Sequence, residues 1–203
     1  LANNSCTLGG DLMLRNYYET DYIHTMRDLL ERSEKKYGLD YAYKELDPER
    51  NLHSYTFVQL REDADALGTS LLERGLLGKH FAIVGESSYS YVVSYMAVSM
   101  GLGVIVPLDK ELSKEELYKL ICKSDAEVLL YSDLLSDDVE EMKGSSPEVS
   151  TFINISMYGT KKESLSILDL LQEGRNLINS GDLRYKTLPI DRNALSAILF
   201  TSG

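Results

Sequence analysis

Segments typical of strands and of helices alternate five times after residue 57, and this alternation limits the possible folds more than any other feature. Each strand candidate is a short apolar run, and the segments between runs carry apolar residues at helical spacing. Such a rhythm requires βαβ crossovers, which produce a mostly parallel sheet with helices on both faces. The sequence therefore predicts an α/β fold, with strands at 81–84, 103–106 (ended by Pro107), 127–131, 151–155 and 197–200.

The helices between these strands are marked by their first residues. Thr56 with Gln59, and Ser113 with Glu116, have the spacing of a capping box, in which each side chain satisfies a free backbone donor at a helix N-terminus. The helix that begins at Ser88 is apolar nearly all round, which indicates that it is largely buried. Helices are expected at 56–75, 88–100, 113–121, 137–143 and 165–178.

The chain before residue 57 is expected to form a smaller unit at the start of the fold. Residues 1–20 carry no clear period and are interpreted as a lead segment. Residues 21–56 are predicted to contain a helix at 22–36 and a short β-hairpin with strands at 41–45 and 53–55. The predicted organisation is thus a lead segment, a helix with a hairpin, and an α/β core over 57–203.

Charge and motif spacing argue against several classes of function. The formal net charge is −11, and an acidic chain repels phosphate backbones, so no nucleic-acid partner is expected. Gly101 and Gly103 begin a dinucleotide-binding pattern, but Val106 occupies the position of its third glycine. The three histidines are scattered, so no metal site is predicted, and no catalytic residue is identified.

The cysteines and the short apolar stretches indicate the compartment. Cys6 and Cys122 lie far apart in the sequence and fit no metal-ligand spacing, which favours reduced thiols and a cytoplasmic location. The N-terminus lacks a basic segment followed by an apolar run, so no signal peptide is expected. The apolar stretches fall short of the roughly 18 residues that a membrane-spanning helix needs, so no transmembrane segment is predicted.

The last residues are the one candidate binding segment. The apolar run 198–200 leads directly into Thr201, Ser202 and Gly203. A small hydroxyl-bearing turn after a parallel strand is a place where backbone N–H groups and hydroxyls can hold phosphate oxygens. On composition alone a simple turn explains these three residues better, so both interpretations remain open at this point.

Four stretches of the sequence, in order, carry a resemblance to a known family: 55–57 with Leu67 and Leu71 (first helix), 81–86 with 91–98 (strand and buried helix), 103–109 (strand and turn) and 199–203 (start of a phosphate loop). Over roughly residues 25–203 they resemble the AMP-binding, adenylate-forming superfamily. The family's loop continues with Ser/Thr-Thr-Gly-x-Pro-Lys-Gly, and the stretches 91–95 and 106–112 look closest to its long-chain fatty acid–CoA ligases. One departure lies at residues 86–89 (Glu-Ser-Ser-Tyr), where many relatives carry an asparagine after the strand.

This resemblance implies an enzyme that uses ATP, Mg²⁺ and a carboxylic acid. The acid attacks the α-phosphate to give an acyl-adenylate, and in the CoA ligases the thiol of CoA then accepts the acyl group. It also implies a phosphate-binding role for Thr201, Ser202 and Gly203. The remaining machinery of the family would lie beyond residue 203, so we expect this fragment to be inactive alone and to bind none of these cofactors.

Two other interpretations remain open. An adenylation domain that loads a carrier protein would share the same motifs, and a catalytically silent α/β binding module would share the fold. For the acyl–CoA ligase, a long-chain acid would suggest peripheral membrane contact. The exposed edge of the truncated sheet would favour dimerisation of the fragment.

Overall fold

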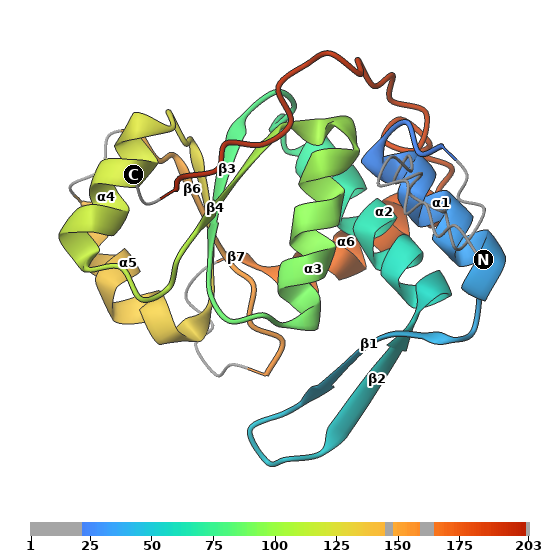
Figure 1. The fold of residues 1–203 in the computed structure, drawn as a ribbon, viewed down its shortest axis with the longest axis horizontal. Coiled ribbons are helices and arrows are strands. Elements are labelled where there is room, and N and C mark those ends of the chain that lie inside the picture. The colour runs from blue at the N-terminus through green and yellow to red at the C-terminus, as the bar shows by residue number, and fades with distance from the viewer. Residues whose placement is uncertain (1–21, 145–147, 159–164, 202–203) are drawn as a thin grey trace, which may run out of the picture.

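The computed structural model describes residues 22–144, 148–158 and 165–201, and it shows an α/β fold preceded by a helix and a hairpin (Figure 1). A five-stranded sheet has the order β4-β3-β5-β6-β7, and every pair of neighbouring strands is parallel. The predicted fold class is therefore confirmed. The strands are β3 (His80–Val84), β4 (Val104–Leu108), β5 (Val128–Tyr131), β6 (Thr151–Asn154) and β7 (Leu165–Ser166).

Helices cover both faces of this sheet (Figure 1). Successive side chains of a strand point to opposite faces, so Phe81 and Ile83 enter one core cluster while Ala82 and Val84 enter the other. The first cluster is closed by α1, α2, α3 and α6, and the second by α4 and α5. The helices are α1 (Met26–Tyr37), α2 (Phe57–Glu73), α3 (Tyr89–Ala97), α4 (Lys114–Lys123), α5 (Ser136–Lys143) and α6 (Ile167–Asn179).

Helix starts follow the predicted capping residues. Both capping boxes form, at Thr56 for α2 and at Ser113 for α4. Helix α1 begins four residues later than predicted, because Thr25 is its N-cap and accepts a hydrogen bond from the Asp28 N–H at 3.1 Å. Side-chain acceptors at these positions satisfy donors that the helix itself leaves free, which sets where each helix begins.

The hairpin consists of β1 (Tyr41–Leu46) and β2 (Leu52–Thr56), which pair antiparallel and project from the end of the sheet where β3 stops (Figure 1). The ring of Tyr55 stacks on the ring of Tyr89 at the start of α3, with centroids 3.6 Å apart. The Tyr43 hydroxyl donates to the Ser87 carbonyl at 2.6 Å. These contacts fasten the hairpin to the core.

The predicted strand at 197–200 is wrong, because only an isolated parallel bridge forms there, between Ala197 and Ile105. The Ile105 N–H donates to Ser196 and the Ile198 N–H donates back to Ile105, both at 3.0 Å. The next bond of a parallel ladder would need an N–H from residue 107, and proline has none. Pro107 lies inside β4, with its nitrogen on the side away from β3, instead of ending that strand as predicted.

The helices predicted at 165–178 and 88–100 also have other boundaries than expected. The helix predicted at 165–178 begins at Ile167, because Ser166 is an extended N-cap and pairs with Asn154 as part of β7. The helix predicted at 88–100 ends as an α-helix at Ala97 and continues as a π-helical turn, Val98–Leu102. Gly101 makes that turn possible, since its φ of 104° is unfavourable for other residues.

Candidate functional site

The predicted phosphate-binding residues follow the bridge between Ala197 and β4. Thr201 is described and exposed, whereas Ser202 and Gly203 lie outside the described residues. The register of the bridge brings the segment 196–201 along β4 in parallel, so Thr201 lies towards the carboxyl end of that strand. The carboxyl ends of parallel strands are where α/β folds bind their ligands.

Thr201 borders a pocket of about 680 Å³ between α4 and the end of the chain, called the loop pocket here. Its apolar wall is in part the phenyl ring of Phe200, which packs against the core cluster of α4 and α5. The ammonium of Lys123 lies 5.8 Å from the centre of that ring. The lining of the loop pocket includes Leu108, Leu112, Lys119, Lys123, Phe200 and Thr201.

Two lysines and two carboxylates line the loop pocket. Each carboxylate accepts hydrogen bonds from its own segment. Asp109 accepts from the Glu111 N–H at 2.9 Å, and Glu116 accepts from the Ser113 N–H and hydroxyl. The Ser113 hydroxyl is the main reason that the pKa of Glu116 is lowered. Lys119 and Lys123 are the positively charged groups of this lining, and ammonium groups can bind phosphate oxygens.

A second pocket, of about 720 Å³, lies under the hairpin and is called the hairpin pocket here. It is lined by hairpin residues 43–48 and by residues that follow β3 (86–88 and 90), β5 (132–134) and β6 (155–158). The connection that leaves β3 runs to β4 on one side, and the connection that leaves β5 runs to β6 on the other. This is the switch point of a doubly wound sheet, a usual ligand position.

Glu45 of the hairpin occupies the N-terminus of α3. Its carboxylate accepts from the Tyr89 N–H at 2.8 Å and from the hydroxyls of Tyr55 and Tyr158 at 3.1 and 3.2 Å. A helix N-terminus attracts negative charge because its N–H groups and its dipole point outwards. Here an internal carboxylate satisfies that attraction, so this helix end is not open to a phosphate.

Asp47 is held at the far end of the hairpin by two residues of β2 and its turn. The hydrogen bond with His53 (2.9 Å), followed by that from Asn51, lowers the pKa of Asp47 to about 2. Asp47 is therefore a carboxylate at neutral pH. It adds negative charge to the rim of the hairpin pocket.

Within the ranges 22–144, 148–158 and 165–201, no group of three or more His, Cys, Asp and Glu side chains is arranged to hold a metal ion. No helix among these residues is long and apolar enough to cross a membrane. Cys122 is a free thiol, and Cys6 lies outside the described residues.

Sequence reasoning located Thr201 but not the side chains around it. Lys119 and Lys123 are four residues apart on α4, a spacing that places both on one helical face. That spacing was the available signal for a basic face, but nothing local shows that the face lies beside residue 201. The hairpin pocket was missed entirely, since it joins residues up to 115 positions apart.

Comparison with known proteins shows which family the chain belongs to. The model of the AMP-binding enzyme family matches residues 30–203. Among solved structures, the anthranilate CoA ligase AuaEII in complex with anthranoyl-AMP is 21% identical with a TM-score of 0.61, and the match covers 73% of this chain and 28% of that chain. Among curated proteins, none matches the chain.

Two other solved structures show the same fold. The adenylation domain of the carboxylate reductase from Mycobacterium chelonae is 18% identical with a TM-score of 0.63, covering 88% of this chain and 32% of that chain. The fatty acyl CoA synthetase of Mycobacterium tuberculosis is 16% identical with a TM-score of 0.62, covering 88% and 33%. The chain spans about a third of the length of these structures. It belongs to the AMP-binding enzyme family and has the fold of the N-terminal portion of these adenylate-forming enzymes.

Proposed function

We propose that this chain is the N-terminal part of an ATP-dependent acid–CoA ligase that activates long-chain fatty acids through an acyl-adenylate. The observation that carries the proposal is the position of Thr201. The chain belongs to the AMP-binding family, and Thr201 lies towards the carboxyl end of β4 and lines one pocket with Lys119 and Lys123. A hydroxyl and two ammonium groups around one pocket are groups that can bind phosphate oxygens.

In this proposal Thr201, Ser202 and Gly203 begin the loop that holds the phosphates of ATP. The loop positions the α-phosphate for attack by the acid carboxylate and offsets the negative charge that develops there. Mg²⁺, when bound with ATP, would supply further charge neutralisation, and CoA would supply the accepting thiol. The other catalytic groups are assigned to the rest of the protein, so the 203-residue chain alone is expected to be inactive.

The choice of a long-chain acid rests on sequence resemblance at 91–95 and 106–112. The fatty acyl CoA synthetase of Mycobacterium tuberculosis shares the fold, which supports the family but leaves the acid to be measured. A carrier-loading adenylation domain is the second candidate. The similarity to a carboxylate reductase adenylation domain supports this second candidate. Its TM-score of 0.63 is as high as the 0.62 of the fatty acyl CoA synthetase.

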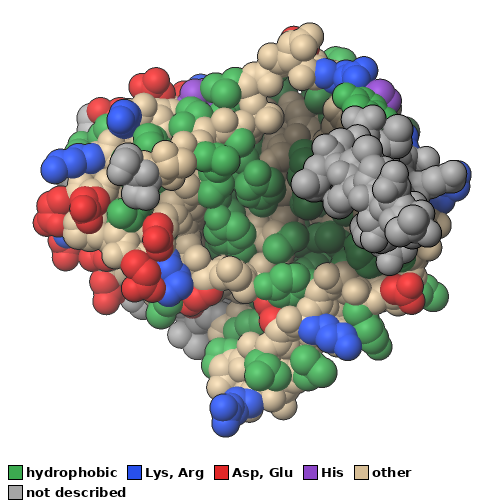
Figure 2. All heavy atoms as spheres, viewed as in Figure 1, with side chains coloured by type: hydrophobic (Ala, Val, Ile, Leu, Met, Phe, Trp, Pro, Cys, Tyr) green, Lys and Arg blue, Asp and Glu red, His purple; other side chains and the backbone are tan. Residues whose placement is uncertain are grey.

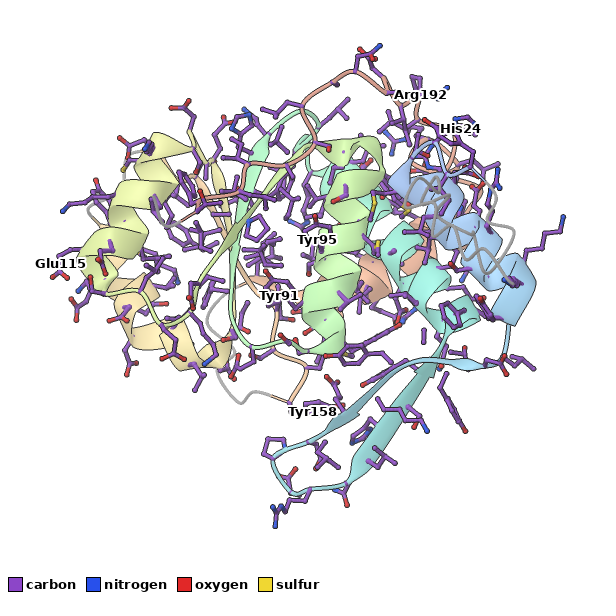
Figure 3. All side chains as sticks on the ribbon, viewed as in Figure 1. His24, Tyr91, Tyr95, Glu115, Tyr158 and Arg192 are labelled. Carbon is purple, nitrogen blue, oxygen red and sulfur yellow. The ribbon has the colours of Figure 1, made fainter. Side chains whose placement is uncertain are left out.

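An apolar surface beside the proposed site supports association with other chains or chain segments. Figure 2 shows apolar side chains gathered in the middle of one face, over α3 and β4, with acidic side chains over α4 and α5. Tyr91 and Tyr95, labelled in Figure 3, lie along α3 on this face, and Leu199 is 68% exposed. We assign this surface to contacts with the rest of the enzyme. Dimerisation of the isolated chain, peripheral membrane contact and a cytoplasmic location remain part of the proposal.

The test is ATP–pyrophosphate exchange by the complete enzyme, with acids from acetate to oleate and a set of amino acids. Activity that peaks at long-chain acids, with the 203-residue chain silent, is the expected result. Thr201→Ala in the complete enzyme should lower exchange on the order of 10²-fold, because it removes a group that meets developing charge. Thr201→Ser, which keeps the hydroxyl, is the matched control and should stay within a few-fold of wild type.

Each other outcome would assign a different function to the protein or to Thr201. Exchange with amino acids alone would move the protein to the carrier-loading branch. No exchange with any acid would leave a catalytically silent α/β binding module. Equal activity of Thr201→Ala and wild type would remove the phosphate-binding role from Thr201, whatever the acid.

A further inference from the structure

We propose that Arg27 of α1 is a positioning residue for the phosphate loop, because its guanidinium holds the segment that leads to Thr201 in register with β4. This segment, residues 182–196, follows α6, passes α1 and α3 and reaches the sheet at β4, and it is called the strap here (Figure 1). Arg27 does not line the loop pocket, so it would act through the strap. The inference rests on the proposed function, because it takes Thr201 as part of a phosphate site.

The contact between the strap and the sheet is too short to fix its own register. It consists of two hydrogen bonds of Ile105, with residues 196 and 198, each at 3.0 Å, and Pro107 prevents a third. In a parallel pair, a slip of one residue moves a side chain by about 3.3 Å and turns it to the other face. Such a slip would change which side chain of the segment 199–201 lines the loop pocket.

Arg27 makes three hydrogen bonds that join the strap to the turn before β4. One terminal nitrogen donates to the Leu188 carbonyl at 2.6 Å, and the other donates to the carbonyls of Tyr185 and Met100 at 2.9 Å each. Tyr185 and Leu188 belong to the strap, whereas Met100 belongs to the π-helical turn that leads into β4. A guanidinium is planar, stays charged and presents its N–H groups in a fixed fork, so it can hold carbonyls of two segments at a set spacing.

The two segments that Arg27 joins are the same two that pair further along the chain. The π-helical turn enters β4, and the strap runs from Leu188 to the bridge at Ile105. Between these points Ile190 lies against Gly101, since a Cβ built on Gly101 would be 2.9 Å from the Ile190 Cγ1. The bonds of Arg27 therefore set the offset between the strap and β4 before the two segments meet at the bridge.

Other contacts of the strap leave this offset to the guanidinium. The fully buried Tyr185 and the ion pair of Lys186 with Asp65, at 3.6 Å, fix only the start of the strap. His24 and Arg192, labelled in Figure 3, lie close together at the start of α1, with 2.6 Å between the Arg192 guanidinium and the His24 Nδ1. Both of these residues are exposed, and an exposed polar contact contributes little.

The first experiment measures amide hydrogen exchange in the ¹⁵N-labelled 203-residue chain. The N–H groups of Ile105 and Ile198 form the two bridge bonds. The neighbouring Val104 N–H donates to the Lys79 carbonyl at 3.0 Å, on the other edge of β4, and is the internal control. In Arg27→Met we expect the two bridge amides to exchange about tenfold faster and the Val104 amide to keep its wild-type rate. Equal acceleration of all three amides would show a general loss of stability and would overturn the proposal.

Arg74→Met is the matched control variant. Arg74 also joins two elements, because it follows α2 and donates to the Glu173 carboxylate of α6 at 2.9 Å. Within the described ranges it forms no ion pair with the strap. This variant should leave the exchange rates of the bridge amides, relative to that of Val104, as they are in wild type.

The second experiment is ATP–pyrophosphate exchange by the complete enzyme, at a temperature where each variant is folded. Arg27→Met should raise KM for ATP on the order of tenfold and leave KM for the acid within about twofold, because only the phosphate loop is displaced. A loss of folded enzyme would instead lower kcat and leave both KM values unchanged. Arg27→Lys keeps the charge and three donors without the fork, so its KM for ATP should lie between those of wild type and Arg27→Met.

The two experiments separate this inference from the proposed function. Selective acceleration of the bridge amides together with a raised KM for ATP would support the positioning role of Arg27. An unchanged KM for ATP in Arg27→Met, in an enzyme that Thr201→Ala impairs, would overturn that role. A complete enzyme without exchange activity would refute the proposed function, and the amide exchange rates would still decide whether Arg27 holds the strap.

Discussion

Replacing Gly174 by alanine tests how closely α6 packs on α2. A Cβ built on Gly174 would lie 1.8 Å from the Ala66 carbonyl oxygen and 2.5 Å from its carbonyl carbon. Real Cβ atoms do not approach closer than about 3.0 Å, so the two helices would have to move apart by more than 1 Å. Overpacking against backbone, which cannot yield, costs about 3 kcal/mol, and alanine returns about 1 kcal/mol of helix propensity. We expect Gly174→Ala to lower the free energy of unfolding by about 2 kcal/mol.

Urea denaturation followed by circular dichroism measures this difference. The matched control is Gly144→Ala at the C-terminus of α5, where an added Cβ meets no atom within 4 Å and φ is −90°. The control should change the free energy of unfolding by less than about 0.5 kcal/mol. A wild-type midpoint for Gly174→Ala would refute the close crossing of α2 and α6, and with it the arrangement of helices on that face.

Two further predictions concern a titrating carboxylate and a buried hydroxyl. The pKa of Asp47 is lowered from 3.8 to about 2, so its carboxylate stabilises the fold above roughly pH 4 and loses that effect as pH falls towards 2. Asp47→Asn should therefore lose less thermal stability than wild type between pH 5 and pH 2, and parallel pH profiles would contradict this. Tyr185 is fully buried, and its hydroxyl donates to the Ala97 carbonyl at 2.6 Å. Tyr185→Phe should lower the free energy of unfolding by about 1 kcal/mol in the same urea assay, and an unchanged value would show that this bond contributes nothing.

Elements that depend on nearby residues could be predicted from the sequence. The capping residues Thr56 and Ser113 start α2 and α4 where expected, because a cap acts within three residues of itself. Buried parallel strands such as β3 and β5 were found because both of their faces are covered, so almost every residue is apolar. The fold class followed from the alternation of these local signals.

Features that depend on distant partners could not be predicted. The run at 197–200 has the composition of a strand, but Pro107, some 90 positions earlier, removes the donor that would extend its pairing. The short strand β7 exists only because β6 offers Ile153 and Asn154 as partners. The same limit applies to the site, where Thr201 could be named but Lys119 and Lys123 could not be placed beside it.

The two pockets at the carboxyl edge of the sheet differ in charge, and this difference indicates which ligand each can take. A triphosphate could in principle use the switch point between β3 and β5, where many doubly wound folds bind phosphates at a helix N-terminus. In this chain Glu45 occupies that helix end, and Asp133 and Asp47 add further negative charge to the same space. The phosphate site proposed for ATP lies instead towards β4, where Lys119 and Lys123 line the loop pocket with Thr201. Exchanging Glu45 for a neutral residue should weaken anchoring of the hairpin without creating a phosphate site at the switch point, because Asp133 and Asp47 would keep that space acidic.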